Sequence, residues 1–247
     1  MRIAAQAKNR SFEPVRPPGL SARARLKLIG KNSACVWGEF MLAGQRIAQV
    51  VWAPNGSLLS ERHFDRHGRV HGLEISRHED GSVEWQMPWL RGQMHGVARQ
   101  RDTEGRDLYR SRFVRGSGVD LWVQGGAITE FREHSNSLVH GIERWGHPLL
   151  PSEEGHFLRG RRAGVFRRWS GKDLERGYPR YFIDDEEVTR SRYVEARSDR
   201  PELQPDRRRD DRRERQMPPA LSLVWLRKEV RGRVGIRPSP DEHFGCG

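Results

Sequence analysis

A short glycine-centred pattern recurs along this chain, and it constrains the fold more than any other feature. Gly68, Gly92 and Gly116 follow one another at steps of 24 residues, and Gly160 comes 44 residues after Gly116. Self-similarity at a fixed period of about 20–50 residues is typical of arrays in which one small structural unit stacks on the next. We therefore expect a repeat protein rather than a domain built around one thick core.

A second set of turn signals lies out of phase with the first. It comprises Asn55-Gly56, Asp80-Gly81, Glu104-Gly105, Gly125-Gly126, Gly146 and Ser170-Gly171. Asn-Gly, Asp-Gly and Gly-Gly pairs favour tight turns because these residues tolerate positive φ. Two turns in each repeat predict two strands in each repeat, which is a β-hairpin.

The segments between the turns alternate apolar and polar residues. Val83, Trp85 and Met87 alternate with Glu84 and Gln86, and the same period of two holds around residues 73–75 and 121–123. Period two indicates strands with one buried face. The predicted fold class is all-β, with serial β-hairpins stacked into an elongated, twisted antiparallel sheet and with disordered basic termini.

Charge divides the chain into three parts. The net charge of +12 separates into +7 for residues 1–31, +1 for residues 32–196 and +4 for residues 197–247. We predict a disordered basic arm over 1–31, the hairpin array with a C-terminal cap over 32–196, and a charged, mostly disordered tail over 197–247. The cap would place a last strand at Tyr181 and Ile183, and residues 221–230 would form a short helix. The nearly neutral array argues against a basic face for nucleic acid.

Cysteine usage and hydropathy bound the location. Cys35 and Cys246 are far apart and lack metal-binding spacing. No apolar run has the length of a signal peptide or of a transmembrane segment. A cytoplasmic location is predicted.

The repeated pattern, aromatic-x-x-Gly-x-x-His-Gly followed by a turn and a strand, resembles the MORN repeat. It is most similar to the variant found in bacterial YwqK-type antitoxins. The resemblance covers about residues 35–185 and rests on residues 64–72, 89–96, 113–118, 138–141 and 157–164. It implies MORN-like stacked hairpins, no catalytic residues and a role in a toxin–antitoxin system. The pattern departs at Gly118, which lacks the preceding His, and at Ala163, which replaces it.

The repeat also defines structural positions. The glycines that carry the pattern are Gly68, Gly72, Gly92, Gly96, Gly116, Gly141, Gly160 and Gly164. His71, His95 and His140 recur at equivalent places but would lie about 10 Å apart, too far to share a metal ion. We expect their rings to pack on an aromatic residue or to bond a turn carbonyl. The acidic run 184–187 is predicted to be a solvated turn.

No nucleophile motif, phosphate loop or metal-binding spacing is present, so we predict no enzyme, no catalytic or metal-binding residue and no cofactor. The first hypothesis is a non-enzymatic scaffold that binds another protein, such as a toxin, as an antitoxin or immunity factor. Tryptophans on the array are the candidate partner-binding residues, with the inter-hairpin core as their alternative place: Trp85, Trp89, Trp122, Trp145 and Trp169. The second hypothesis is a peripheral binder of anionic lipid or nucleic acid through the basic termini.

Overall fold

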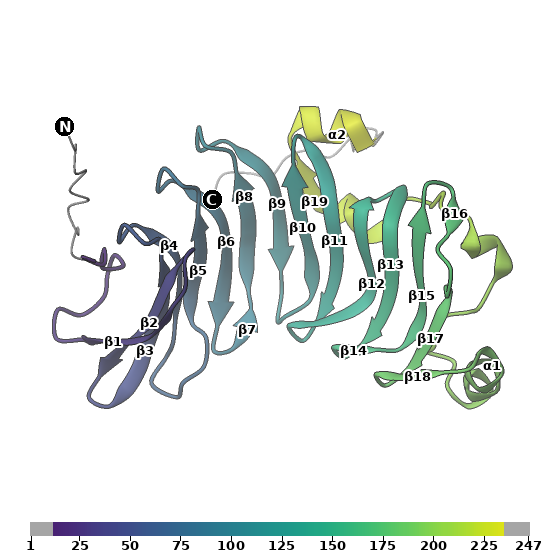
Figure 1. Cartoon of the computed structure of the whole chain (residues 1–247), viewed down its shortest axis with the longest axis horizontal. Helices are drawn as coiled ribbons and strands as arrows, with labels where there is room; N and C mark the ends of the chain where they lie inside the picture. The colour runs from purple at the N-terminus through teal and green to yellow at the C-terminus, as the bar shows by residue number, and fades with distance from the viewer. Residues whose placement is uncertain (1–11, 235–247) are drawn as a thin grey trace, which may run out of the picture. The chain divides into compact units, whose positions relative to one another are not determined.

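The computed structural model describes residues 12–234 and shows antiparallel strands joined by short turns (Figure 1). Strands account for 53% and helices for 11%, so the all-β prediction is confirmed. The chain divides into two compact units. The first comprises Met1–Gly92 and Thr103–Gly105, and the second comprises Gln93–Asp102 and Arg106–Gly247.

The first unit is a meander in which each strand pairs with the next. The strands are β1 (Arg25–Lys31), β2 (Val36–Leu42), β3 (Gln45–Trp52), β4 (Leu58–His63), β5 (Gly72–Arg77) and β6 (Val83–Leu90). Turn signals in the sequence lie between them, as at Asn55-Gly56 and Asp80-Gly81. The order follows from the turns, because a short turn can only join antiparallel neighbours.

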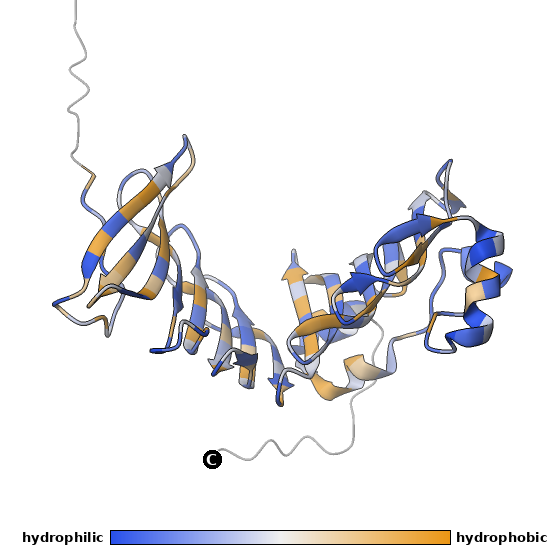
Figure 2. Cartoon of the chain, turned by 90° about the horizontal axis from the view of Figure 1, so that it is seen from below, coloured by the Kyte–Doolittle hydropathy of each residue, from blue (hydrophilic) through white to orange (hydrophobic). Residues whose placement is uncertain are grey.

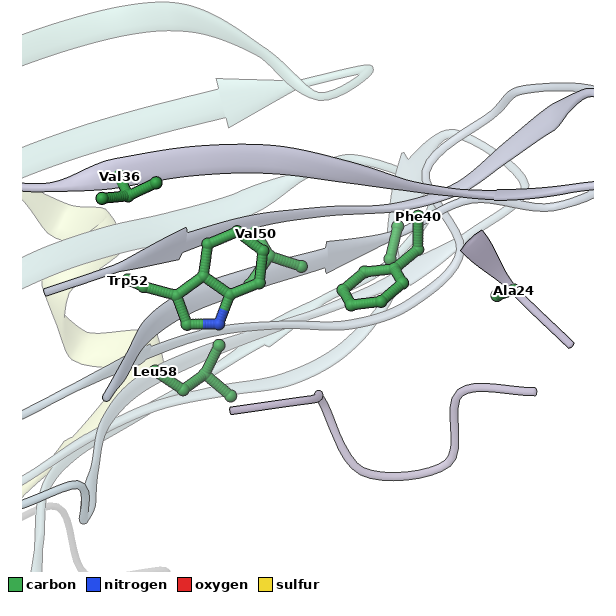
Figure 3. Packing of buried hydrophobic residues seen from close by; sticks show 7 residues of the cluster. Ala24, Val36, Phe40, Val50, Trp52 and Leu58 are labelled. Atoms are coloured by element: carbon green, nitrogen blue, oxygen red, sulfur yellow. The ribbon is translucent and has the colours of Figure 1, made fainter. Parts of the chain in front are cut away.

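The core of the first unit lies on one face of β2, β3 and β4 (Figure 3). Trp52 is fully buried, and its ring meets Phe40 edge to face with 6.2 Å between ring centroids. The segment before β1 covers this face, since Phe12 packs edge-on against Trp52 at 6.1 Å. The indole N–H of Trp52 donates to the carbonyl of Val15 at 2.7 Å, which satisfies its polar group in the core.

These contacts correct the prediction that residues 1–31 are a disordered arm. Within the described residues 12–31 the chain is ordered, and β1 pairs with β2 along its length. The physical reason is that a one-sided sheet leaves Trp52 and Phe40 exposed unless another segment covers them. The first 11 residues of the predicted arm lie outside the described residues.

The second unit contains the remaining strands. They are β7 (Gln93–Met94), β8 (Gly96–Arg101), β9 (Asp107–Phe113), β10 (Gly118–Gln124), β11 (Ala127–Ser135), β12 (Leu138–His147), β13 (Leu150–Leu158), β14 (Arg161–Arg162), β15 (Gly164–Ser170), β16 (Asp173–Leu174), β17 (Arg180–Ile183), β18 (Glu186–Val188) and β19 (Val224–Leu226). Within the unit the strand orders are β8-β9-β19 and β10-β11-β12-β13-β15-β17-β18. Hydrophobic and hydrophilic residues alternate along the strands (Figure 2).

The predicted last strand at Tyr181 and Ile183 is confirmed as β17, and Asp184 and Asp185 form its turn to β18. Helix α1 (Arg190–Asp199) follows and runs past the predicted boundary at 196. Its one buried residue, Tyr193, donates its hydroxyl to the carbonyl of Gln204 at 2.7 Å. The Tyr193 ring also packs against Tyr181 of β17, with 5.4 Å between ring centroids, and this contact attaches the helix to the array.

After α1 the chain runs back along the second unit (Figure 1, green to yellow). This return segment, residues 200–234, contains the 3-10 turns η1 (Arg208–Asp211) and η2 (Pro219–Leu223), then β19 and helix α2 (Lys228–Val234). Leu203, Leu221 and Leu226 of this segment are buried. Strand β19 pairs with β9 from Val224↔Ser111 to Leu226↔Tyr109.

The return segment corrects the prediction of a mostly disordered tail over 197–247, and of one helix over 221–230. Within that range, residues 221–223 end the 3-10 turn η2, and residues 224–226 form strand because the edge of β9 offers unpaired backbone groups, which pairing satisfies. Residues 235–247 of the predicted tail lie outside the described part of the chain.

Candidate functional site

One turn geometry recurs where the sequence reads Arg-Gly. The φ angles are +52° and +86° at Arg91 and Gly92, and the pairs at 115–116 and 159–160 have the same signs. Two successive residues at positive φ make the type I′ turn that suits a two-residue hairpin loop. Of the predicted repeat glycines, seven have positive φ: Gly68, Gly72, Gly92, Gly96, Gly116, Gly141 and Gly160. Gly164 instead lies where an added Cβ would come within 2.6 Å of the His156 Cβ.

The recurrent histidines hold these turns. The backbone N–H of Arg91 donates to Nδ1 of His71 at 3.3 Å, and the N–H of Gly92 donates to the carbonyl of Val70 at 2.8 Å. The same pair of bonds joins Arg115 to His95 and Gly116 to Met94, then Arg159 to His140 and Gly160 to Val139.

Each histidine thus accepts a hydrogen bond from a turn N–H, which corrects the expectation that it bonds a turn carbonyl. Because Nδ1 accepts, the ring proton lies on Nε2. Among residues 12–234 no group of three or more His, Cys, Asp or Glu side chains could hold a metal ion. The histidines act on turn geometry.

In the first unit these turns border a surface depression, which we term the turn site. It is lined by Asp65, Arg66, His67, Arg69, His71 and Arg91. The Asp65 carboxylate is already engaged: it accepts from Nε of Arg69 at 2.8 Å and from two backbone N–H groups of its own loop. The hydrogen bond from Arg69 lowers the pKa of Asp65 to about 2, so the carboxylate stays charged and bound to Arg69.

The charges of two arginines in the turn site are not neutralised by an ion pair. Arg66 and Arg91 are exposed, and neither makes an ion pair with a carboxylate of the described residues. Arginines within the strands contrast with them, since Arg62 pairs with Glu74 and Arg77 pairs with Glu61. The turn site therefore presents uncompensated positive charge on a rigid turn.

The second unit repeats this chemistry at its own turns. Arg115 and Arg159 are exposed and likewise lack an ion-pair partner among the residues the structure describes. His95 and His140 fix their backbones as His71 fixes that of Arg91. The motif Arg-Gly with an upstream His is thus a recurring way to hold one arginine at a hairpin end.

The predicted partner-binding tryptophans do not behave as one set. Trp145 is 41% exposed, with the Arg132 guanidinium over its ring at 4.7 Å. Trp122 and Trp145 both face Glu130 across β11, which places them on the same face of the sheet. Trp85 and Trp89 are half-buried, and Trp89 donates its indole N–H to Glu74 at 2.9 Å. Trp169 is buried under the return segment.

Of the acidic run 184–187, Asp184 and Asp185 form the β17–β18 turn, and Glu186 and Glu187 begin β18. Asp184 bonds Arg200 at 2.7 Å, and this hydrogen bond lowers the pKa of the Asp184 carboxyl. Glu186 pairs with Arg192 at 2.8 Å. The carboxylates are thus partnered within the chain.

Comparison with known proteins gives little. No protein-family model and no curated protein matches the chain. A solved structure, "Crystal structure of accessory secretory protein 1,2 and 3 in Streptococcus pneumoniae", is similar over 40% of this chain with 16% identity and a TM-score of 0.29. The match covers 19% of that protein's chain. No helix within residues 12–234 has the length and hydropathy needed to cross a bilayer.

Proposed function

We propose that the protein is a non-enzymatic repeat scaffold that binds an acidic segment of another protein through its arginine turns, with the turn site as the principal contact. One observation carries the proposal: Arg66 and Arg91 lie exposed in a depression whose only carboxylate, Asp65, is already held by Arg69. An uncompensated guanidinium attracts anions, and its planar fork matches a carboxylate with two parallel hydrogen bonds.

The site is also prepared for binding before a ligand arrives. The turn at Arg91 is fixed by two backbone hydrogen bonds, to His71 and to Val70. A rigid backbone lowers the entropy that is lost on binding, because only the arginine side chain remains to be ordered. The Nε2–H of His71 adds a neutral donor beside the arginine. The arrangement suits a carboxylate that needs several donors.

An acidic protein segment fits better than a nucleic acid. Residues 32–196 carry a net charge of only +1, so the body as a whole lacks the field that draws a polyanion. Local unpaired arginines in a neutral body favour a ligand with few, well-placed carboxylates. The resemblance to YwqK-type antitoxins supports a protein partner, and a toxin with an acidic surface segment is the candidate within this proposal.

The test uses a fluorescently labelled glutamate-rich peptide and the full-length protein. Arg66→Ala combined with Arg91→Ala should weaken binding about tenfold or more, since each charge-assisted hydrogen bond contributes roughly 1.5–3 kcal/mol. The matched control is Arg176→Ala combined with Arg208→Ala, which removes the same charge from two other exposed positions. An equal loss of peptide affinity in both variants would show that net charge, and not the turn site, causes the effect.

A single-stranded oligonucleotide of the same charge provides the second arm. We expect it to bind more weakly than the peptide and to lose affinity steeply with salt. Tighter binding of the oligonucleotide, with the same dependence on Arg66 and Arg91, would assign the turn site to nucleic acid instead.

A further inference from the structure

The middle of the return segment, residues 205–217, lies over β12, β13 and β15, and we term it the strap. Its backbone is joined to the sheet at three points, one of which is the carbonyl of Gln216, which accepts from the Arg144 guanidinium at 3.0 Å. The N–H of Arg215 donates to the carbonyl of Leu149 at 2.9 Å, and the indole of Trp169 donates to the carbonyl of Asp211 at 2.8 Å. The remaining contacts come chiefly from two arginines of the strap, Arg213 and Arg215.

Arg215 enters an acidic and aromatic pocket. Its Nε donates to Oε2 of Glu154 at 2.9 Å, and its guanidinium stacks over the Trp169 ring at 4.6 Å. Glu154 is 4% exposed and also accepts from Nε of Arg144 at 2.8 Å. A carboxylate together with an aromatic face suits a guanidinium, because its plane can stack on the ring while Nε–H donates to the carboxylate.

Arg213 is recognised by backbone. Its guanidinium donates to the carbonyls of Pro151 at 2.8 Å, Gly171 at 2.7 Å and Leu150 at 3.1 Å. Three carbonyls at the ends of two hairpins use three of its N–H donors. The sheet therefore binds two arginines that are separated by one residue.

The strap is held by hydrogen bonds, ion pairs and the stack of Arg215 on Trp169, without a buried apolar side chain of its own. No apolar side chain of residues 205–217 is buried, and the buried side chains there are the charged ones of Asp206 and Arg215, whereas Leu203 before the strap and Leu221 and Leu226 after it are fully buried. A segment with few buried apolar contacts opens locally at a small fraction of the global unfolding free energy. The flanking leucines allow the strap to open while the rest of the return segment stays attached.

The strap also leaves its site incompletely satisfied. The Arg167 side chain is fully buried, its Nε donates to Asp211 of the strap at 3.1 Å, and its two terminal nitrogens have no hydrogen-bond partner. Three arginines, 144, 167 and 215, share the carboxylates of Glu154 and Asp211. Unpaired buried donors cost free energy, so an occupant that brings another acceptor to Arg167 would fit better than the strap does.

From these contacts we propose that the strap occupies, in cis, a binding site for an Arg-x-Arg segment of another protein, which displaces it. This site is distinct from the turn site, because it holds arginine side chains of the strap and is not proposed to hold a carboxylate of a partner. Because the strap is tethered, it competes at an effective concentration of about the millimolar range. The partner segment must therefore bind the opened site with a Kd well below this effective concentration. The strap thus sets the affinity that a partner segment needs in order to bind.

The test uses a labelled peptide with the sequence of residues 205–217 and the full-length protein. Wild-type protein should bind it weakly, because its own strap fills the site. Arg213→Ala combined with Arg215→Ala should bind the peptide about tenfold or more tightly, since the tethered competitor is weakened. The control Arg207→Ala with Arg208→Ala, at exposed strap positions, should bind as wild type does. A peptide with Lys at both arginine positions should lose affinity.

A second measurement on wild-type protein covers the case in which the double variant fails to fold. Amide hydrogen exchange of residues 205–217 should be faster than that of β12 and β19 by about tenfold or more, as expected for local opening. Equal peptide affinity for wild type and the folded double variant would overturn the proposal. Strap amides protected as long as those of β12 would also overturn it, because the strap would then be a permanent part of the fold.

Discussion

Two turn glycines that are equivalent in the sequence are predicted to differ in their tolerance of a side chain. Gly92→Ala should cost about 1–2 kcal/mol, the strain of an L-residue at φ of +86°. Gly116→Ala adds a collision, because its Cβ would meet the backbone N of Ser137 and lie 2.6 Å from the carbonyl carbon of Asn136. We expect at least about 3 kcal/mol there. Chemical denaturation measures both, and equal losses would contradict the packing at Gly116.

His134 is predicted to make stability depend on pH. Burial, together with the charge of Arg132, lowers the pKa of this imidazole from 6.5 to about 4. The unfolded chain takes up the proton near pH 6.5, and the folded chain does so only near pH 4. Stability from neutral His134 is therefore complete above pH 6.5 and is lost as the pH falls toward 4, by at most about 3 kcal/mol.

The measurement is the free energy of unfolding between pH 7 and pH 4 for wild type and His134→Gln. The variant should show a shallower decline. Carboxyls such as Asp102, where Arg227 and Arg106 outweigh burial and lower the pKa to about 2, lose their contribution below this window. Parallel curves for the two proteins would show that His134 is not the titrating group.

The residues of the turn site can be identified in the sequence, but their contacts in space cannot be predicted from it. Arg91-Gly92 could be recognised as a turn, because positive φ selects glycine. That the Arg91 N–H bonds His71, 20 residues earlier, depends on how one hairpin stacks on the previous one. That no carboxylate of residues 12–234 forms an ion pair with Arg66 or Arg91 likewise depends on the tertiary arrangement, and no local sequence pattern encodes it.

At the scale of elements, strands and turns of the body follow from period two and from glycine, and both were predictable. The terminal segments were not, because their charge and prolines indicate disorder when read alone. Their structure depends on contacts with other parts of the same chain. Residues 12–24 pack on the sheet face that holds Trp52, and β19 pairs with the edge of β9. Propensity fails where tertiary contact supplies the stabilisation.

The return segment is predicted to stabilise the second unit. Leu226→Ala in β19 should cost about 2–4 kcal/mol, because Leu226 is 2% exposed and its loss leaves a cavity. Leu223→Ala, three residues earlier and 74% exposed, should stay within about 0.5 kcal/mol of wild type. Urea denaturation of both variants provides the comparison. A negligible effect of Leu226→Ala on the free energy of unfolding would show that this segment does not pack on the unit and would support the disordered tail predicted from the sequence.

At the scale of the whole molecule, arginines in strands differ from arginines at the Arg-Gly turns in whether they form ion pairs. Within the strands arginines are largely paired with carboxylates, as Arg132 is with Glu130 and Glu143. At the Arg-Gly turns they are not. Exposed ion pairs contribute little to stability, so unpaired turn arginines cost the fold almost nothing. In the function that we propose, these arginines are the groups that contact an anionic partner.

The central claim is that the turn arginines are the binding residues, and side-chain NMR tests it most directly. Nε–Hε resonances of Arg66 and Arg91, assigned from their alanine variants, should shift on titration with the glutamate-rich peptide. Those of Arg62 and Arg77, which are ion-paired within strands of the same unit, should stay in place. Saturating peptide that leaves the Arg66 and Arg91 signals unmoved, or that moves all four equally, would contradict the account.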